Sequence, residues 1–285
     1  MKERWVTFDC FGTLVDWNGG FRGNLERLAG DRVDALLEAF HQHERLVEAS
    51  TPHVNYREVL AAALTRAAEQ CGISCSDVEA AMIGDCWDIL RPFDDVEATL
   101  ASLRQAGFRL GVLTNCDDDL FELTHGHFRE RFDLVVTAES VMDYKLSLSH
   151  FRRFQRITGV APGHWIHAAC SWFHDMGPAA KLGIPSVWVD RDRTGDDPSI
   201  VSIRIESAAQ LCDAVRRLSA DDAESGAESL FRLEELNEGR PSASQLPTVL
   251  FRSSWISEIV CRSRLPYFLE HERLEHEGTD QIFHG

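Results

Sequence analysis

Residues 4–9 read Arg-Trp-Val-Thr-Phe-Asp, a short apolar run that ends in an acid and is typical of a buried strand. Similar apolar runs follow it at 109–114, 132–137, 164–168 and 185–189. Helical patterns separate these runs, near 94–106, 117–128, 147–158 and 175–182. Strands that alternate with helices predict right-handed crossovers and a parallel sheet covered on both faces. The sequence therefore predicts an α/β fold with a doubly wound, Rossmann-like parallel sheet, in which 201–205 adds an edge strand and 207–218 a closing helix.

A long stretch between the first strand and the helix near residue 94 contains no convincing strand. Helical spacing dominates it, at 23–46, 55–71 and 76–90. These residues form either extra helices packed on the sheet or a helical insertion over the carboxyl end of the first strand, where open α/β sheets bind ligands. Because the stretch follows that strand immediately, its position favours the insertion. We therefore expect a core of residues 1–16 and 92–217 and a helical cap at 17–91.

The C-terminal stretch, residues 218–285, differs in character from the rest of the chain. It contains 13 acidic and six basic residues and opens with a polar, Ser- and Glu-rich segment. Such a start is typical of a linker and predicts an acidic extension that is partly disordered. Apolar residues return at 246–260 and 265–269, which indicates that part of the extension docks. The sequence assigns it no function.

Charge and composition exclude several classes of function. The 285 residues include 46 acidic and 29 basic side chains, a net charge of −17, which argues against binding to nucleic acid or to an anionic membrane surface. No apolar run approaches the roughly 20 residues that cross a bilayer. The chain enters its first strand directly and leaves no room for a signal peptide. We expect a cytoplasmic protein whose eight cysteines are reduced, structural thiols.

Polar side chains stand at the ends of several predicted strands. Asp9 ends the first strand, and Thr114 and Asn115 end the second. Lys145 lies after the third strand, and Asp175 lies in the turn that follows residue 168. Taken singly, each has a structural explanation, such as a helix cap, a turn or a solvated charge. Because the carboxyl ends of neighbouring parallel strands converge, the whole set indicates a catalytic site.

Four motifs in this order resemble those of the haloacid dehalogenase superfamily, across residues 1–217, and in particular those of the type II 2-haloacid dehalogenases. The first is Phe-Asp-Cys-Phe-Gly-Thr-Leu-Val-Asp at 8–16, and the second and third are Leu-Thr-Asn at 113–115 and Tyr-Lys at 144–145. The fourth is His-Ala-Ala-Cys-Ser-Trp-Phe-His-Asp at 167–175, continuing into Gly-Ile-Pro at 183–185. The resemblance implies that Asp9 is a nucleophile that forms a covalent ester, and that Thr114 and Lys145 orient it and balance its charge. It also implies that the helices between the first two motifs form a cap that selects substrates.

Two positions depart from the phosphatases of the superfamily. Those enzymes carry a second aspartate two residues after the nucleophile as general acid and base, where this chain has Phe11. Their fourth motif begins with an acid that helps to hold Mg²⁺, where this chain has Cys170. A thiol is a poor ligand for a hard cation, and an alkoxide that leaves from phosphate needs a proton donor. Both departures point away from phosphate and predict no metal and no other cofactor.

Halide leaves as a stable anion and needs neither part, so the resemblance implies a metal-independent (S)-2-haloacid dehalogenase. We expect Asp9 to attack C2 of a small 2-haloacid with inversion and to release halide. Water activated by Asp175, with help from Lys145, then hydrolyses the ester. Substrate contacts are expected from the backbone after Asp9, from Thr114, from the motif-two amide and from the cap; the residues assigned to substrate binding are Cys10, Phe11, Thr13, Asn115 and His41. The resemblance is also compatible with a homodimer formed through the cap or the core.

Further departures concern the pocket. The cap arginine that assists halide departure in this family is best matched by His41, with Arg45 one turn further on. Trp172 replaces an asparagine, Phe151 a tyrosine, and Leu146 the proline after the motif-three lysine. These changes predict an altered pocket and leave the natural substrate open. Two alternatives rank behind the dehalogenase: an Mg²⁺-dependent phosphatase of the same superfamily, and a non-catalytic descendant in which the cap or the acidic tail binds a partner.

Overall fold

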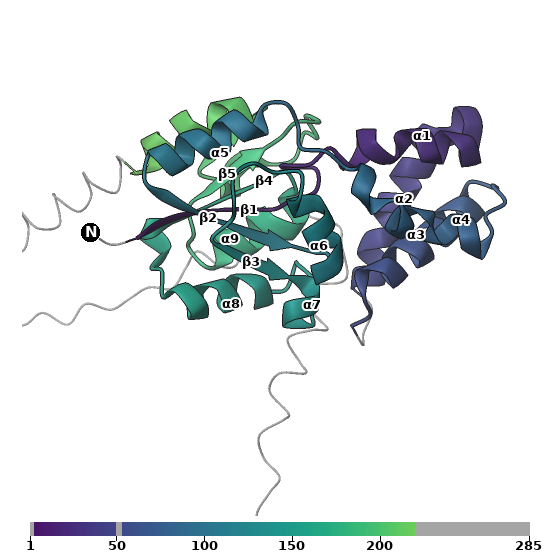
Figure 1. The fold of residues 1–285 in the computed structure, drawn as a ribbon, viewed down its shortest axis with the longest axis horizontal. Coiled ribbons are helices and arrows are strands. Elements are labelled where there is room, and N and C mark those ends of the chain that lie inside the picture. The colour runs from purple at the N-terminus through teal and green to yellow at the C-terminus, as the bar shows by residue number, and fades with distance from the viewer. Residues whose placement is uncertain (1–2, 50–52, 220–285) are drawn as a thin grey trace, which may run out of the picture. The chain divides into compact units, whose positions relative to one another are not determined.

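The computed structural model describes residues 3–49 and 53–219 of the chain. Within these residues, six strands form one parallel sheet in the order β3-β2-β1-β4-β5-β6 (Figure 1). The strands are β1 Arg4–Phe8, β2 Phe108–Thr114, β3 Leu134–Thr137, β4 Trp165–Ala169, β5 Ser186–Val189 and β6 Ile203–Ile205. The sheet grows from β1 to β3 on one side and from β4 to β6 on the other, so the switch point lies between β1 and β4. The predicted fold class is confirmed, and each predicted apolar run overlaps an observed strand.

Helices cover both faces of this sheet. They are α5 Val96–Gln105, α6 Asp118–His125, α7 Ala138–Val141, α8 Ser149–Thr158 and α9 Gly177–Lys181, and residues 211–219 continue as a further helix. Figure 1 shows α5 and the 211–219 helix on one side of the sheet and α8 on the other. The strand residues alternate accordingly, since Val6 packs in one buried cluster with Leu100 of α5 and Trp5 packs in another with Phe154 of α8. Burial on both faces explains why the strands read as continuous apolar runs.

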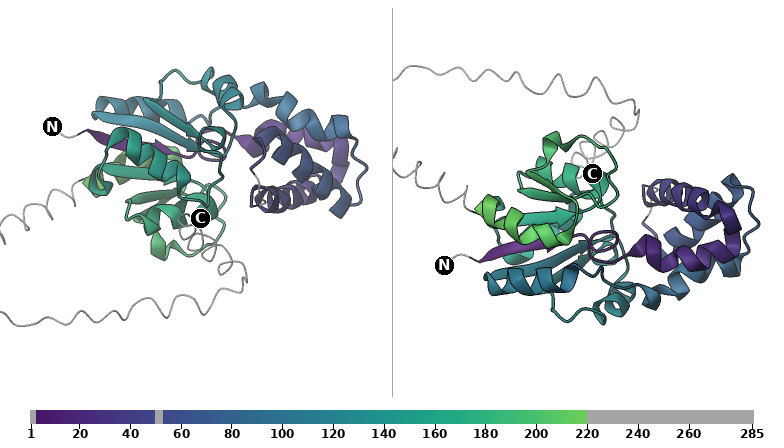
Figure 2. Two further views of the ribbon diagram at one scale, coloured as in Figure 1. Left: turned by 90° about the horizontal axis from the view of Figure 1, so that it is seen from below. Right: turned by 90° about the horizontal axis from the view of Figure 1, so that it is seen from above.

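A group of helices lies between β1 and β2 in the chain and takes no part in the sheet. It consists of α1 Trp17–Ala29, α2 Val33–Glu48, α3 Tyr56–Gln70 and α4 Asp77–Asp85, with 3₁₀ turns at Gly30–Arg32 and Trp87–Ile89. Figures 1 and 2 show this group beyond the carboxyl ends of the strands. The chain leaves and re-enters the core side by side, because Val15 bridges Pro92 and the N–H of Asp16 donates to the carbonyl of Arg91. The insertion is therefore confirmed, and we propose that core and cap divide here, at 16/17 and 91/92.

The cap helices begin where the sequence supplies capping side chains. The carboxylate of Asp16 accepts a hydrogen bond from the N–H of Gly19 at the start of α1, and Asn55 caps α3 in the same way. Ser76 and Glu79 form a capping box at the start of α4. Each such cap satisfies backbone N–H groups that have no partner inside the helix, and typically stabilises the helix by about 1 kcal/mol.

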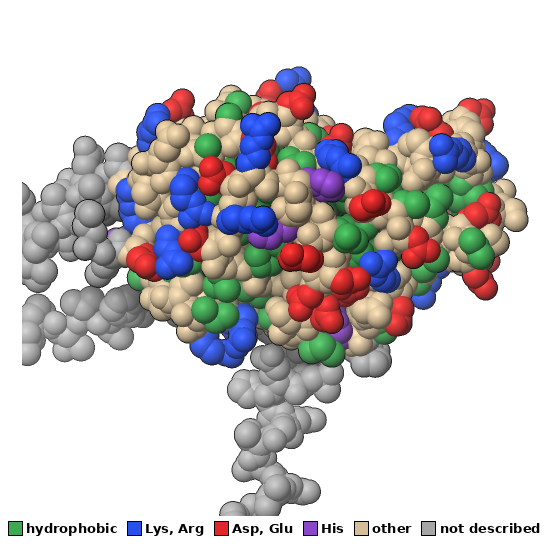
Figure 3. Space-filling view, in the orientation of Figure 1, with side chains coloured by type: hydrophobic (Ala, Val, Ile, Leu, Met, Phe, Trp, Pro, Cys, Tyr) green, Lys and Arg blue, Asp and Glu red, His purple; other side chains and the backbone are tan. Residues whose placement is uncertain are grey.

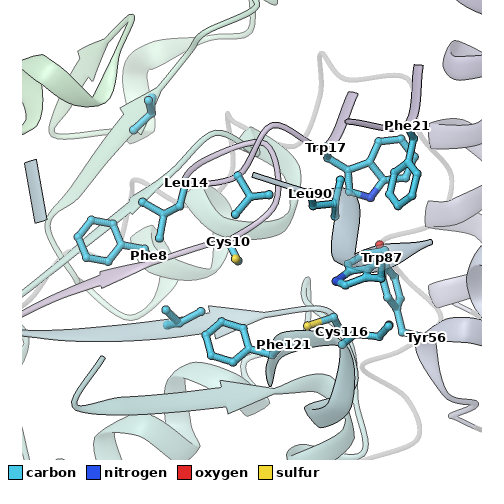
Figure 4. Close-up of a cluster of buried hydrophobic side chains, with 14 of the residues drawn as sticks. Phe8, Cys10, Leu14, Trp17, Phe21, Tyr56, Trp87, Leu90, Cys116 and Phe121 are labelled. Atoms are coloured by element: carbon cyan, nitrogen blue, oxygen red, sulfur yellow. The ribbon is translucent and has the colours of Figure 1, made fainter. Parts of the chain in front are cut away.

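One hydrophobic cluster joins the sheet to the cap. Figure 4 shows Phe8 and Leu14 of the core in the same cluster as Trp17 and Phe21 of α1, with Trp87 at the junction. Trp87 is fully buried, and its indole N–H donates to the Thr124 hydroxyl of α6 at 3.0 Å. The cap helices thus complete the burial of the segment that follows β1.

The surface of the described residues mixes charges of both signs. Figure 3 shows acidic and basic side chains interspersed over one face, with histidines among them. In the part of the chain that the structure describes, no helix is long and apolar enough to cross a membrane. The predicted acidic extension lies, from residue 220 onward, outside the described residues.

Candidate active site

The residues expected at the strand ends come together at the carboxyl edge of the sheet. Asp9 directly follows β1, Lys145 lies in the loop between α7 and α8, and Asp175 lies in a π-helical turn, Trp172–Met176, that follows β4. The ammonium of Lys145 donates to Asp9 Oδ1 at 2.8 Å and to Asp175 Oδ1 at 2.7 Å. Its third hydrogen bond goes to the carbonyl of Leu113, at 2.9 Å. The core of the site is therefore two carboxylates that share one cation.

Burial makes these charges strongly interdependent, since the exposed fraction of Asp9 is 7%, of Lys145 3% and of Asp175 0%. Burial raises the pKa of Asp9 above its ordinary value, and although Lys145 opposes this, the charge of Asp175 adds to it. Burial would also raise the pKa of Asp175, but Lys145 and a hydrogen bond from His167 lower it to about 2. The two carboxylates hold the pKa of Lys145 above its ordinary value despite its burial. Two buried acids with one base leave a net negative site in which Asp9 takes up a proton before Asp175.

A tight loop after β1 orients the Asp9 carboxylate. The Thr13 hydroxyl donates to Asp9 Oδ2 at 2.8 Å and accepts from the N–H of Cys170, also at 2.8 Å. Gly12 has φ +83°, and a Cβ there would lie 2.9 Å from the Cys170 sulfur, so the turn requires glycine. Arg191 fixes the loop from behind by donating to the carbonyl of Thr13. Each oxygen of Asp9 thus has one hydrogen-bond donor and a defined direction.

The two polar residues of the second motif, Asn115 and Thr114, have different hydrogen-bond partners. The Asn115 side chain accepts from the N–H of Lys145 at 2.8 Å and donates to the carbonyl of the same residue at 3.1 Å. Its amide also donates to Glu48 of the cap at 3.0 Å. The Thr114 hydroxyl, in contrast, donates to the sulfur of Cys116 at 3.6 Å. Asn115 therefore holds the Lys145 loop in place, and the assignment of both residues to substrate remains a prediction.

Comparison with known proteins agrees with this geometry. The sequence profile of the haloacid dehalogenase-like hydrolases matches residues 3–166. This chain is a haloacid dehalogenase-like hydrolase. The (S)-2-haloacid dehalogenase of Pseudomonas putida is 24% identical over 198 residues, which span 67% of this chain and 86% of that protein. The glyceraldehyde 3-phosphate phosphatase of Methanopyrus kandleri is 29% identical over 142 residues, or 46% of this chain and 60% of that one.

Solved structures of related proteins share the fold of this hydrolase. The L-2-haloacid dehalogenase of Xanthobacter autotrophicus, solved with chloropropionic acid covalently bound, superposes with a TM-score of 0.65 at 18% identity, over 75% of this chain and 98% of that one. At this level of identity the likeness shows the fold alone. The roles of individual residues in this hydrolase therefore rest on its own geometry.

The two positions that depart from the phosphatases do not offer ligands to Mg²⁺. Phe11 packs edge-on against Trp87, with ring centroids 4.7 Å apart. The Cys170 sulfur lies 3.8 Å from the carbonyl of Phe11, and burial raises the pKa of this thiol to about 12. In the described part of the hydrolase, no group of three or more His, Cys, Asp or Glu side chains is arranged to hold a metal ion. The side chains at these two positions therefore supply no oxygen ligand to Mg²⁺.

The cap places one carboxylate beside this site. Glu48, the last residue of α2, is buried and lies 3.2 Å from the imidazole Nε2 of His174 as well as contacting Asn115. Burial raises the pKa of Glu48. Burial by itself would lower the pKa of His174, but Glu48 raises it above its ordinary value. Neither residue was assigned a role from sequence, because a glutamate on an amphipathic helix and a histidine in a turn give no distinguishing pattern.

His41 is held within the cap. Its Nδ1 lies 3.1 Å from Glu44 Oε2 and its Nε2 lies 2.9 Å from the Asn18 side-chain oxygen. The Glu44 carboxylate also accepts a hydrogen bond from the Tyr56 hydroxyl at 2.5 Å. Arg45 instead places its guanidinium 5.5 Å from the centre of the Phe173 ring, beside the fourth motif. Both ring nitrogens of His41 thus have partners, and its assignment to halide remains a prediction.

Proposed function

We propose that this hydrolase cleaves the carbon–halogen bond of a small 2-haloacid through a covalent ester on Asp9, without a metal ion. The observation that carries the proposal is the shared ammonium of Lys145, which contacts Asp9 and Asp175 together. The acids that a phosphatase needs are replaced by Phe11 and Cys170. A site with a nucleophile, a base and one cation between them suits a leaving group that departs as a stable anion.

In the first step, a lone pair of the Asp9 carboxylate forms a bond to C2 while the electrons of the carbon–halogen bond leave with the halide. The hydrogen bonds from Thr13 and Lys145 hold the carboxylate in one orientation. C2 inverts, and Asp9 becomes a neutral ester. The backbone N–H groups of Cys10 and Phe11, the Thr13 hydroxyl and Asn115 are the proposed contacts of the substrate carboxylate and halide, with His41 on the cap side.

In the second step, water attacks the ester carbonyl carbon, and Asp175 accepts a proton from that water. Collapse of the tetrahedral intermediate releases the 2-hydroxyacid and restores the Asp9 carboxylate. One water oxygen remains on Asp9, and one proton is released overall. Lys145 and His167 lower the pKa of Asp175, so its carboxylate is ionised at neutral pH, which is the state that a base requires.

The test is halide release from each enantiomer of 2-chloropropionate with EDTA present throughout. Asp9→Asn removes the nucleophile. Asp16→Asn is the matched control, because it is the same substitution in the same segment, at a residue that caps α1. We expect wild type and Asp16→Asn to release halide and Asp9→Asn to release none. A single turnover in ¹⁸O-labelled water should place the label in the peptide that contains Asp9. Halide release by Asp9→Asn, or label in the product alone, contradicts the ester.

A second candidate is an Mg²⁺-dependent phosphatase, favoured by the similarity to the Methanopyrus kandleri glyceraldehyde 3-phosphate phosphatase. It predicts turnover of phosphate esters that requires Mg²⁺ and stops with EDTA. Phosphate release under these conditions, together with no halide release, would replace the dehalogenase proposal. No turnover of either substrate class would favour the non-catalytic descendant.

A further inference from the structure

A histidine lies in the middle of the otherwise apolar strand β4 and reaches the base of the proposed reaction. His167 is fully buried, and its Nε2 lies 3.0 Å from Asp175 Oδ1. Its Nδ1 lies 2.9 Å from the Thr7 hydroxyl on the neighbouring strand β1. The Thr7 oxygen in turn accepts the indole N–H of Trp165 at 2.7 Å. These contacts form one buried, hydrogen-bonded chain along one face of the sheet, from Trp165 at the start of β4 to Asp175 in the active site.

The chemistry of the partners determines which group donates and which accepts in each hydrogen bond of this chain. A carboxylate only accepts hydrogen bonds, so His167 must carry a proton on Nε2 and donate it to Asp175. An indole N–H only donates, so the Thr7 oxygen accepts from Trp165 and is free to donate its own proton to Nδ1 of His167. The neutral imidazole with its proton on Nε2 therefore satisfies every group. The Phe151 ring, edge-on at 4.9 Å, packs the imidazole from the side.

The hydrogen-bonded chain determines which oxygen of Asp175 is available to the hydrolytic water. Oδ1 accepts from both Lys145 and His167. Oδ2 is buried and has no hydrogen-bond partner among the described residues. The residues next to His167 in β4 are apolar, so their side chains offer no other donor to Oδ1. Loss of His167 would therefore leave Lys145 alone to set the plane of the Asp175 carboxylate. A base must present one oxygen in one direction, and an error of about 1 Å can cost roughly 100-fold in rate.

We infer that His167 is a positioning residue for the second step, which aims Asp175 Oδ2 at the hydrolytic water. The inference rests on the proposed function. In the step concerned, the water oxygen bonds to the ester carbonyl carbon, its proton passes to Asp175 Oδ2, the bond from that carbon to the substrate oxygen breaks, and the proton passes on to the leaving alkoxide. The first step uses Asp9 and does not need Asp175 as a base. Loss of His167 should therefore slow ester hydrolysis and spare ester formation.

The experiment follows both steps in one reaction, with halide measured by rapid quench and the ester on Asp9 measured by mass spectrometry of the intact chain. In His167→Phe we expect a burst of about one halide per active site, followed by turnover that is roughly 10- to 100-fold slower, with the ester accumulating. His167→Gln, whose amide nitrogen can donate from nearly the position of Nε2, should recover most of the second step. The matched control is Val160→Ala, a change in the buried cluster on the same face of the sheet, at a residue outside the hydrogen-bonded chain. It should lower the melting temperature without a burst.

Thr7→Val provides the same test with His167 left in place. It removes the acceptor of the Trp165 N–H and the donor to Nδ1, so the imidazole is no longer held and a smaller burst, with hydrolysis slowed several-fold, is expected. Equal slowing of both steps in His167→Phe and Thr7→Val, or the same partition in His167→Gln as in His167→Phe, would overturn the role of His167 while leaving the proposed function intact. No halide release by the wild-type chain would overturn the proposed function and this role with it.

Discussion

The two sides of the active site are built on different principles. On the side of the sheet, the motif residues form a closed set of charges in which the Lys145 ammonium donates to both Asp9 and Asp175. On the side of the cap, α2 presents the carboxylate of Glu48 to Asn115 and His174. The sheet side is held by strand ends that parallel pairing brings together, whereas the cap side is held by the packing of the buried faces of its helices. Under the proposed function, the residues of the reaction come from the strand ends and those that select the substrate come from the cap.

The electrostatics of the two sides differ in the same way. The sheet side carries two acids against one base, and the cap adds Glu48, which is balanced by His174 of the core. A cap of this kind attracts a small carboxylate less strongly than an arginine would, which predicts a high KM for 2-chloropropionate. Through its contacts with Asn115 and His174, Glu48 also joins the cap to the core beside the site.

The strongest test of the sheet side is Lys145→Met, which removes the cation and keeps the length of the side chain. Two buried carboxylates would then face each other, and one must take up a proton. We expect a loss of about 3–5 kcal/mol in the free energy of unfolding, as for other broken buried ion pairs. Halide release should fall by roughly 100- to 1000-fold. Urea denaturation and the halide assay measure the two effects, and Lys181→Met, an exposed position at the end of α9, is the control. Unchanged stability would mean that the set is not closed as described.

Glu48→Gln tests the cap side. Removal of one negative charge near the site should favour an anionic substrate by about 1–2 kcal/mol at an effective dielectric constant near 20, so KM for a 2-haloacid should fall roughly tenfold with little change in kcat. The control is Glu38→Gln, the same change at an exposed position of the same helix. Equal KM values for the two variants would remove Glu48 from substrate selection.

The pH dependence of stability gives the smallest effect and sharpens the same contact. The pKa of His174 is raised in the folded state, so its contribution is fully present below the ordinary value of 6.5 and is lost as pH rises through the higher folded-state pKa. The pKa of Glu48 is also raised above its ordinary value of 4.5, so its contribution to stability likewise falls as pH rises above 4.5. The melting temperature should therefore fall between pH 6 and 9 more steeply in wild type than in Glu48→Gln, with about 2–4 °C for each kcal/mol. Parallel curves would show that the pair does not contribute.

Most of the fold could be predicted because its signals are local. The apolar run at 4–9 and its later counterparts overlap the strands, and the convergence of Asp9, Lys145 and Asp175 follows from parallel pairing. The π-helical turn at Trp172–Met176 was not predicted, since one extra residue in a turn leaves no periodic pattern.

Partners that depend on tertiary contacts were also missed. His167 was quoted as part of a motif without a role, although a histidine inside an apolar strand was the available signal. Glu48 and His174 approach each other only after the cap packs over the sheet, and their positions in the sequence, 126 residues apart, carry no sign of it. The sequence therefore predicts residues that lie at strand ends, but not the pairs that form only when one element packs against another.

The buried cluster that runs from Phe8 through Trp87 into Trp17 has a consequence for cooperativity. A cap that shares its hydrophobic core with the sheet cannot melt as an independent module, because its removal would expose Trp87 and the segment after β1 to water. The described chain therefore behaves as one cooperative unit rather than as a scaffold with an exchangeable part. A substitution in the cap must therefore preserve this shared core if the fold is to keep its stability.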